Sequence, residues 1–129
     1  LFAEYEEEAF LYQRMAEMLY GYHKHVKPIK ELVPVRKFVV GYTSDQTVVA
    51  TFPIDLLYWT ELSDLGSAAL AELDLTGRPI KKTELWFTGT LTPKAMQELN
   101  ARGMVIKERA GEILMPLEEA PQEEESQKE

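Results

Sequence analysis

Apolar residues recur every three or four positions along residues 1–27, a spacing that predicts one long amphipathic helix. Neither Gly nor Pro occurs before Gly21, and good helix formers dominate. The apolar positions form two adjacent seams. The first seam is Phe2, Tyr5, Ala9, Tyr12, Ala16 and Leu19, and the second is Leu11, Met15, Met18 and Tyr22. Because this apolar face is unusually wide, we expect the helix to be buried on two sides or to meet a partner as well as its own core.

The pattern in the middle of the chain predicts a β-hairpin followed by a helical segment. Two runs rich in β-branched residues, 36–43 and 47–52, are typical of strands, and the polar break between them predicts a β-hairpin. We interpret the preceding segment, bracketed by Pro28 and Pro34, as a connector. Residues 55–75 are predicted to be helical in two pieces, broken near Ser63-Asp64 or near Gly66.

The segment from Glu84 to Arg109 combines a strand, a helix and a second strand. Residues 85–88 read as a buried strand, Thr92 as a helix N-cap followed by a proline at the first helical position, and Gly103 as the helix end. Residues 104–106 form the second strand. This pattern predicts a compact βαβ unit with parallel strands.

After a turn at residues 110–111, residues 113–115 read as a last strand that pairs antiparallel with 104–108. Residues 118–129 contain no large apolar residue and are expected to form a disordered acidic tail. The whole pattern predicts an α+β fold with one mixed sheet of about four or five strands. We expect the helix over 1–27 to pack with residues 28–117 as a single domain.

Composition narrows the class of protein. The 129 residues are 45% hydrophobic and 28% charged, which is ordinary for a globular domain. Cysteine is absent, which excludes disulfides, thiolate metal sites and cysteine nucleophiles. No apolar run reaches the length of a transmembrane helix, so contact with a membrane would need a segment outside this sequence.

The net charge of −8 is concentrated at the two ends of the chain. Four glutamates stand among residues 4–8, and residues 118–129 are strongly acidic, while the body between them is close to neutral. The sequence therefore offers no broad basic face, and we expect no nucleic-acid partner.

The loop that begins the predicted βαβ helix is a candidate anion site. Thr88, Gly89 and Thr90 lie where a strand end meets a helix N-terminus, and Lys94 adds positive charge. Free backbone N–H groups and the helix dipole attract anions at such a place. A single glycine falls short of a phosphate-binding fingerprint, and turn and cap formation explain the same residues. A small-molecule or anion-binding domain is therefore the alternative function.

The same segment resembles the opening of a BRCT domain, in which a strand ending in Thr-Gly leads to a helix and a second strand. Thr88-Gly89 matches that pattern, as do Leu99 and Gly103 in general placement. The resemblance implies a phosphate contact at Thr-Gly. A BRCT domain continues with a further helix, strand and tryptophan-bearing helix, for which this chain has no matching sequence, so we do not assign the family. The segment is also similar to C-terminal parts of uncharacterised bacterial envelope proteins, which favours an envelope or periplasmic location over the cytoplasm.

No catalytic or metal-binding pattern emerges from the residues. His23 and His25 stand two positions apart, a spacing that points them in different directions on a helix. Asp55, Glu61 and Asp64 flank aromatic residues, and helix capping and a helix break explain them equally well. We therefore predict no enzyme activity, no cofactor and no metal.

The sequence hypothesis is a non-enzymatic binding or assembly domain of a larger protein. It would contact a protein partner or a second copy through the first helix, because the aromatic residues there exceed what a core of this size needs. The candidate interface residues are Phe2, Tyr5, Tyr12, Met15, Leu19 and Tyr22.

Overall fold

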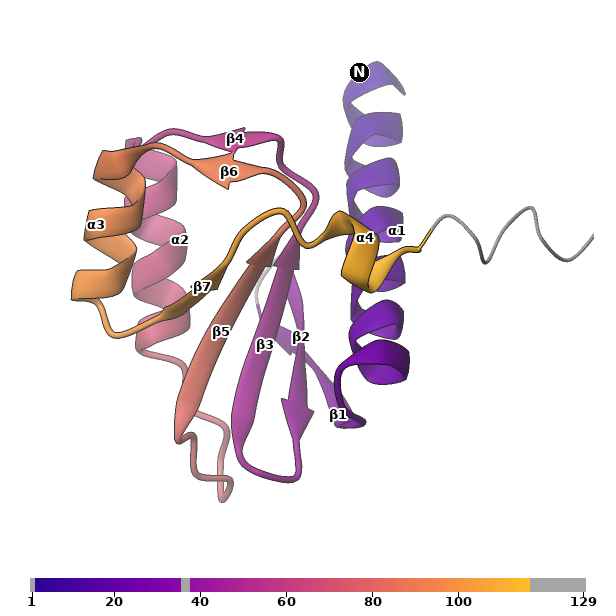
Figure 1. Ribbon diagram of the computed structural model, residues 1–129, viewed down its shortest axis with the longest axis vertical. Helices are drawn as coiled ribbons and strands as arrows, with labels where there is room; N and C mark the ends of the chain where they lie inside the picture. The colour runs from indigo at the N-terminus through magenta and orange to yellow at the C-terminus, as the bar shows by residue number, and fades with distance from the viewer. Residues whose placement is uncertain (1, 36–37, 117–129) are drawn as a thin grey trace, which may run out of the picture.

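The computed structural model describes residues 2–35 and 38–116, with backbone alone for residues 2–6, and it has three layers (Figure 1). A five-stranded sheet lies between α1 and α4 on one face and α2 and α3 on the other. The elements are α1 (Phe2–His25), β1 (Ile29–Val35), β2 (Phe38–Thr43), β3 (Thr47–Phe52), β4 (Leu56–Leu57), α2 (Glu61–Ala71), β5 (Lys82–Phe87), β6 (Thr90–Leu91), α3 (Pro93–Ala101), β7 (Val105–Lys107) and α4 (Gly111–Leu114). The predicted acidic tail, 118–129, lies outside the described residues.

The strand order in the sheet is β1-β2-β3-β5-β7. The first three strands pair antiparallel, whereas β3, β5 and β7 pair parallel. The strands β4 and β6 form a separate parallel pair. The α+β fold with one mixed sheet is therefore confirmed, as is the hairpin, whose tight turn places Gln46 at a φ of 69°.

The βαβ unit is confirmed with parallel strands. The Thr92 side chain caps α3, and Gly103 ends the helix with a φ of 81°. The Met104 N–H donates to the Leu99 carbonyl at 3.3 Å and the Gly103 N–H to the Asn100 carbonyl at 2.9 Å. These two bonds form the Schellman motif, which satisfies carbonyls at the helix end.

Two predictions about the first half of the chain are wrong. The expected connector is an edge strand, β1, which tolerates Pro34 because the edge of a sheet does not require every N–H to be bonded. The helix over 55–75 is a single α2 that runs unbroken through Gly66 and starts at Thr60, whose side chain accepts from the Ser63 N–H. Residues 56–57 belong to β4 instead.

The predicted final strand is also wrong, because residues 111–114 form the short helix α4. Arg109 adopts a positive φ of 51°, and this bend turns the chain from β7 toward α1. There Gly21 packs directly on the backbone of Leu114, so closely that a Cβ at residue 21 would overlap that carbonyl. Contact with α1 therefore decides the conformation of this segment.

The sheet buries a different core on each face. On the α2 and α3 face, the core includes Val48, Ala50, Leu85, Phe87 and Leu99. The smaller core under α1 and α4 consists of Met18, Leu19, Tyr22, Val49, Trp86, Ala110 and Leu114. Alternating residues of β3 and β5 supply the two cores, as the pleat of a strand requires.

Candidate functional site

The N-terminal half of α1 extends beyond the sheet (Figure 1). All seven residues from 7 to 13 are exposed, including Phe10 at 62% and Leu11 at 41%. We call residues 2–13 the projecting half of α1 and residues 14–25 its packed half. In the packed half, Met18 and Tyr22 are fully buried. One helix with continuous apolar seams therefore has two different surroundings.

An apolar groove runs along α1 where the helix passes the β1–β2 edge of the sheet. Its volume is about 550 Å³. Two strand residues in it, Leu32 and Val39, are exposed although apolar. The groove is lined by Tyr12, Met15, Ala16, Leu19, Tyr20, His23, Ile29, Leu32 and Val39.

The structure divides the predicted interface residues into three groups. Tyr12 lies at the surface and lines the apolar groove. Met15, Leu19 and Tyr22 are almost completely buried within the chain, because the packed half of α1 needs them to cover the sheet. Met15 and Leu19 still form part of the groove floor, whereas Tyr22 has no exposed surface to offer a partner.

The side chains of Phe2 and Tyr5 lie outside the described residues. Six groove residues were not among the predicted interface residues: Ala16, Tyr20, His23, Ile29, Leu32 and Val39. Leu32 stands in the segment interpreted as a connector. The half-buried Val33 and the buried Val35 stand two positions apart, and this spacing was the available signal of a strand whose other face carries the exposed Leu32.

A buried carboxylate joins the packed half of α1 to the sheet. The Glu84 side chain accepts hydrogen bonds from the Trp86 indole N–H at 2.9 Å and the Tyr22 hydroxyl at 3.3 Å, and it pairs with Lys82 Nζ at 3.2 Å. Tyr22 and Trp86 also meet edge to face, with ring centroids 5.3 Å apart. Burial, and then the Glu84 charge, raise the pKa of the Tyr22 hydroxyl.

Every buried polar side-chain atom of this cluster has a hydrogen-bond partner. Among the described residues, no buried side-chain polar atom lacks a hydrogen-bond partner. A buried carboxylate with three donors is held in one orientation, which fixes how α1 sits on the sheet. We therefore interpret the Glu84 cluster as a structural element that holds the groove in shape.

The loop predicted to bind anions has its backbone donors already engaged. The N–H groups of Thr88, Gly89 and Thr90 donate to carbonyls of residues 52, 54 and 55 at 3.2, 2.9 and 2.9 Å. The next N–H, of Leu91, donates to the Glu108 carboxylate at 2.8 Å. An acidic side chain of the chain itself thus lies where an anion was expected.

The remaining features of that loop have structural explanations too. Gly89 is required because a Cβ there would overlap the Asp55 backbone. Lys94 pairs with Glu98 at 3.1 Å, one helical turn further along α3. The donors and the charge on which the anion-site prediction depended are therefore bonded within the chain.

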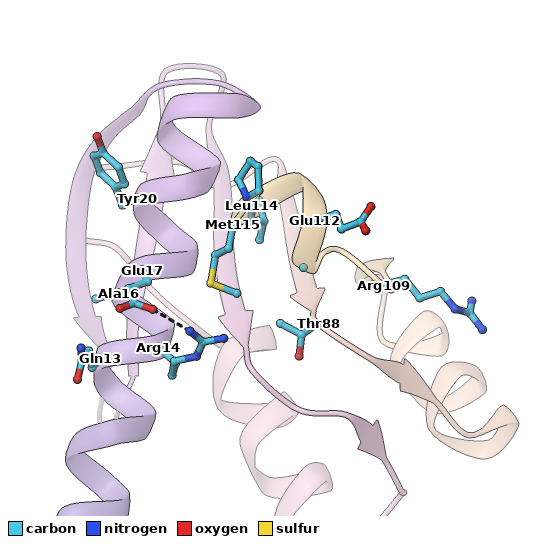
Figure 2. A pocket seen from close by; sticks show the side chains of 12 residues that line it. Gln13, Arg14, Ala16, Glu17, Tyr20, Thr88, Arg109, Glu112, Leu114 and Met115 are labelled. Carbon is cyan, nitrogen blue, oxygen red and sulfur yellow. Dashed lines mark hydrogen bonds and ion pairs between the residues drawn. The ribbon is translucent and has the colours of Figure 1, made fainter. Parts of the chain in front are cut away.

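A second, wider groove of about 1240 Å³ lies between α1 and α4 (Figure 2). Arg14 in this groove pairs with Glu17 at 3.0 Å. Figure 2 shows the side chains of Arg109 and Glu112 pointing away from α1. Two arginines and two glutamates balance, and their side chains do not converge on one point. This groove therefore lacks the convergent polar groups that mark a ligand site.

The described residues, 2–35 and 38–116, carry neither a cluster of metal ligands nor a helix that could cross a membrane. No three potential ligands among His, Cys, Asp and Glu come together there. His23 Nδ1 accepts the Ile29 N–H at 2.8 Å, so this histidine links the last turn of α1 to the start of β1. No helix in the same part of the chain has the length and apolar character needed to cross a membrane.

Comparison with known proteins adds no relative: no protein-family model, no curated protein and no solved structure matches this chain. The geometry of α1 and the apolar groove is therefore the basis for any functional conclusion.

Proposed function

We propose that this domain is a non-enzymatic binding or assembly module that contacts another protein chain through α1. The observation that carries this proposal is the run of seven exposed residues, 7–13, which continues directly into the apolar groove. A helical segment as short as residues 7–13 is only marginally stable in water without tertiary packing. This segment would therefore gain stability when a partner covers it.

The chemistry of the surface supports a protein partner. Tyr12 and Tyr20 flank the groove, and tyrosine is a common interface anchor because it combines a large apolar ring with a polar tip. Leu32 and Val39 add exposed aliphatic area from the sheet edge. A continuous apolar surface of this kind marks interaction sites in proteins.

A photo-cross-linking amino acid at position 12 tests the proposal, with the same substitution at the exposed Tyr58 as matched control. Both variants are produced in cells and irradiated. We expect protein adducts, with a second copy or another chain, at position 12 and far fewer at position 58. Equal yields at both positions, or none at position 12, would contradict the proposal.

A further inference from the structure

We infer that the partner is a second copy of this chain, and that the two α1 helices pair antiparallel. Each projecting half would then fill the apolar groove of the other copy. This inference rests on the proposed function and specifies its partner. The spacing of the seam, the length of the groove and the distribution of charge support it.

The groove side of α1 carries a heptad-like seam. Tyr12, Ala16, Leu19 and His23 line the groove at alternating steps of four and three. Ala9 continues the same spacing into the projecting half, and the sequence extends it through Tyr5 and Phe2. A repeat of this kind keeps one face of a helix against a second helix along its length. The alanines let the two backbones approach closely.

The projecting half and the groove match in length. At 1.5 Å per residue, the groove spans about 17 Å of helix from Tyr12 to His23, and residues 2–13 span about the same distance. Two copies can therefore exchange projecting halves reciprocally. Such an exchange is an isologous contact, which closes as a dimer and leaves no unpaired surface for further growth.

Charge selects the antiparallel orientation. The first turns of α1 contain Glu4 and Glu6–Glu8, whereas its last turn contains Lys24 and the start of β1 contains Lys30. Antiparallel pairing places the acidic end of one helix beside the basic end of the other. A parallel pair would bring two acidic ends together, and that repulsion is unfavourable.

The seam also indicates a register. When residue 12 of one copy faces residue 16 of the other, Tyr12 lies opposite Ala16 and Ala9 lies opposite Leu19. Large side chains then meet small ones along the seam, which gives good packing. The same register brings position 4 level with Lys24. The two-fold axis passes at the level of residue 14.

A two-fold axis perpendicular to the helices places both sheets on the same side of the pair. Leu11, which continues the core seam beyond the sheet and is 41% exposed, is then expected to contact Leu32 and Val39 of the second copy. The second copy therefore covers three apolar side chains that the single chain leaves in water.

Disulfide trapping tests the orientation, because the chain has no cysteine of its own. A tagged Tyr12→Cys chain is mixed with an untagged Ala16→Cys chain under mild oxidation. We expect mainly the mixed disulfide, since these positions are level, whereas two residues 12 are about 6 Å apart along the axis. Ala9→Cys alone should not cross-link, because its two copies are about 15 Å apart along the axis. Efficient Ala9→Cys dimers would contradict the antiparallel pair.

Sedimentation equilibrium tests the dimer independently of the cysteines. Leu32→Glu should raise the dissociation constant at least tenfold, because it places a charge in the groove at a site that is 59% exposed in the single chain. Leu62→Glu is the matched control on the other face, at 78% exposure, and should leave association unchanged. Circular dichroism checks that both variants fold.

A monomeric wild-type chain at high micromolar concentration, or equal dissociation constants for the two variants, would overturn self-pairing. The proposed function fails separately. If position 12 gives photo-adducts only with other proteins while the chain sediments as a monomer, self-pairing is wrong and the docking surface stands. If position 12 gives no adducts at all, the docking surface is wrong as well.

Discussion

The two halves of α1 share one apolar pattern and differ in what covers it. In the packed half, Met18 and Tyr22 have no exposed surface, and a buried carboxylate bonds to the Tyr22 hydroxyl. In the projecting half, Leu11 belongs to the same seam and is 41% exposed. The sequence pattern thus specifies which face of the helix is apolar. The extent of the sheet determines how much of that face is buried within the chain.

The largest difference between the halves should appear in stability. Met18→Ala leaves a cavity between α1 and the sheet and should reduce the free energy of unfolding by about 2–5 kcal/mol. Leu11→Ala, at the corresponding seam position of the projecting half, should change it by about 0.5 kcal/mol or less at low protein concentration. Urea denaturation in the low micromolar range measures both values. Similar losses would show that the projecting half packs within the single chain.

The contact between α1 and α4 should reverse the usual effect of replacing a helical glycine. Gly66→Ala in α2 meets only Phe38 at ordinary contact distance and should stabilise the protein by about 0.5–1 kcal/mol. Gly21→Ala should instead destabilise it by about 1–3 kcal/mol, because the new methyl group displaces the Leu114 backbone. Thermal unfolding of the two variants provides the comparison. Stabilisation by Gly21→Ala would mean that α4 is not held against α1.

The stability that the packed half of α1 contributes should also fall at high pH. The raised pKa of Tyr22 means that the folded state holds this proton more tightly than the unfolded state. Stability from this group is therefore fully present below about pH 10 and is lost as the pH rises further, by at most about 1.4 kcal/mol per pH unit. Denaturation between pH 8 and pH 11.5 should show this loss, and Tyr22→Phe should reduce it. An unchanged slope in the variant would assign the alkaline loss to other groups.

The smallest expected effect concerns the loop at 88–92. Because its backbone N–H groups are bonded within the chain, millimolar phosphate at constant ionic strength should leave the melting temperature unchanged. Glu108→Gln removes the charge of the side chain that accepts the Leu91 N–H, so phosphate binding to this loop should be easier to detect in this variant than in the wild-type chain. A clear rise in melting temperature with phosphate in the wild-type chain would restore the anion-binding alternative.

Local signals predicted much of the fold. The βαβ unit was predictable because the N-cap at Thr92, the adjacent proline and Gly103 are local signals that lie directly at the two ends of α3. The strands of the hairpin were predictable from their β-branched content. Predictions failed where distant contacts decide the structure. The segment after Arg109 becomes helical because it packs on Gly21, some ninety positions earlier, and β1 forms because β2 pairs with it.

The candidate site was predictable in kind but not in detail. Helical spacing identified α1 as an apolar surface, yet it could not distinguish Tyr22, which the sheet buries, from Tyr12, which lines the groove. Leu32 and Val39 belong to other elements, so only the pairing of β1 with β2 and the packing of α1 place them in one groove. The internal bonding of the predicted anion loop was not predictable for the same reason, because Glu108 reaches the loop from another part of the chain.

Hydrogen exchange in the two halves of α1, followed as a function of protein concentration, tests the central claim most directly. Amides of residues 15–22 should be protected at every concentration, because they lie in the intramolecular core. Amides of residues 7–13 should exchange rapidly in dilute solution and become protected as the concentration rises through the dissociation constant. Exchange in residues 7–13 that stays the same across all concentrations would contradict the claim that a second copy covers the projecting half.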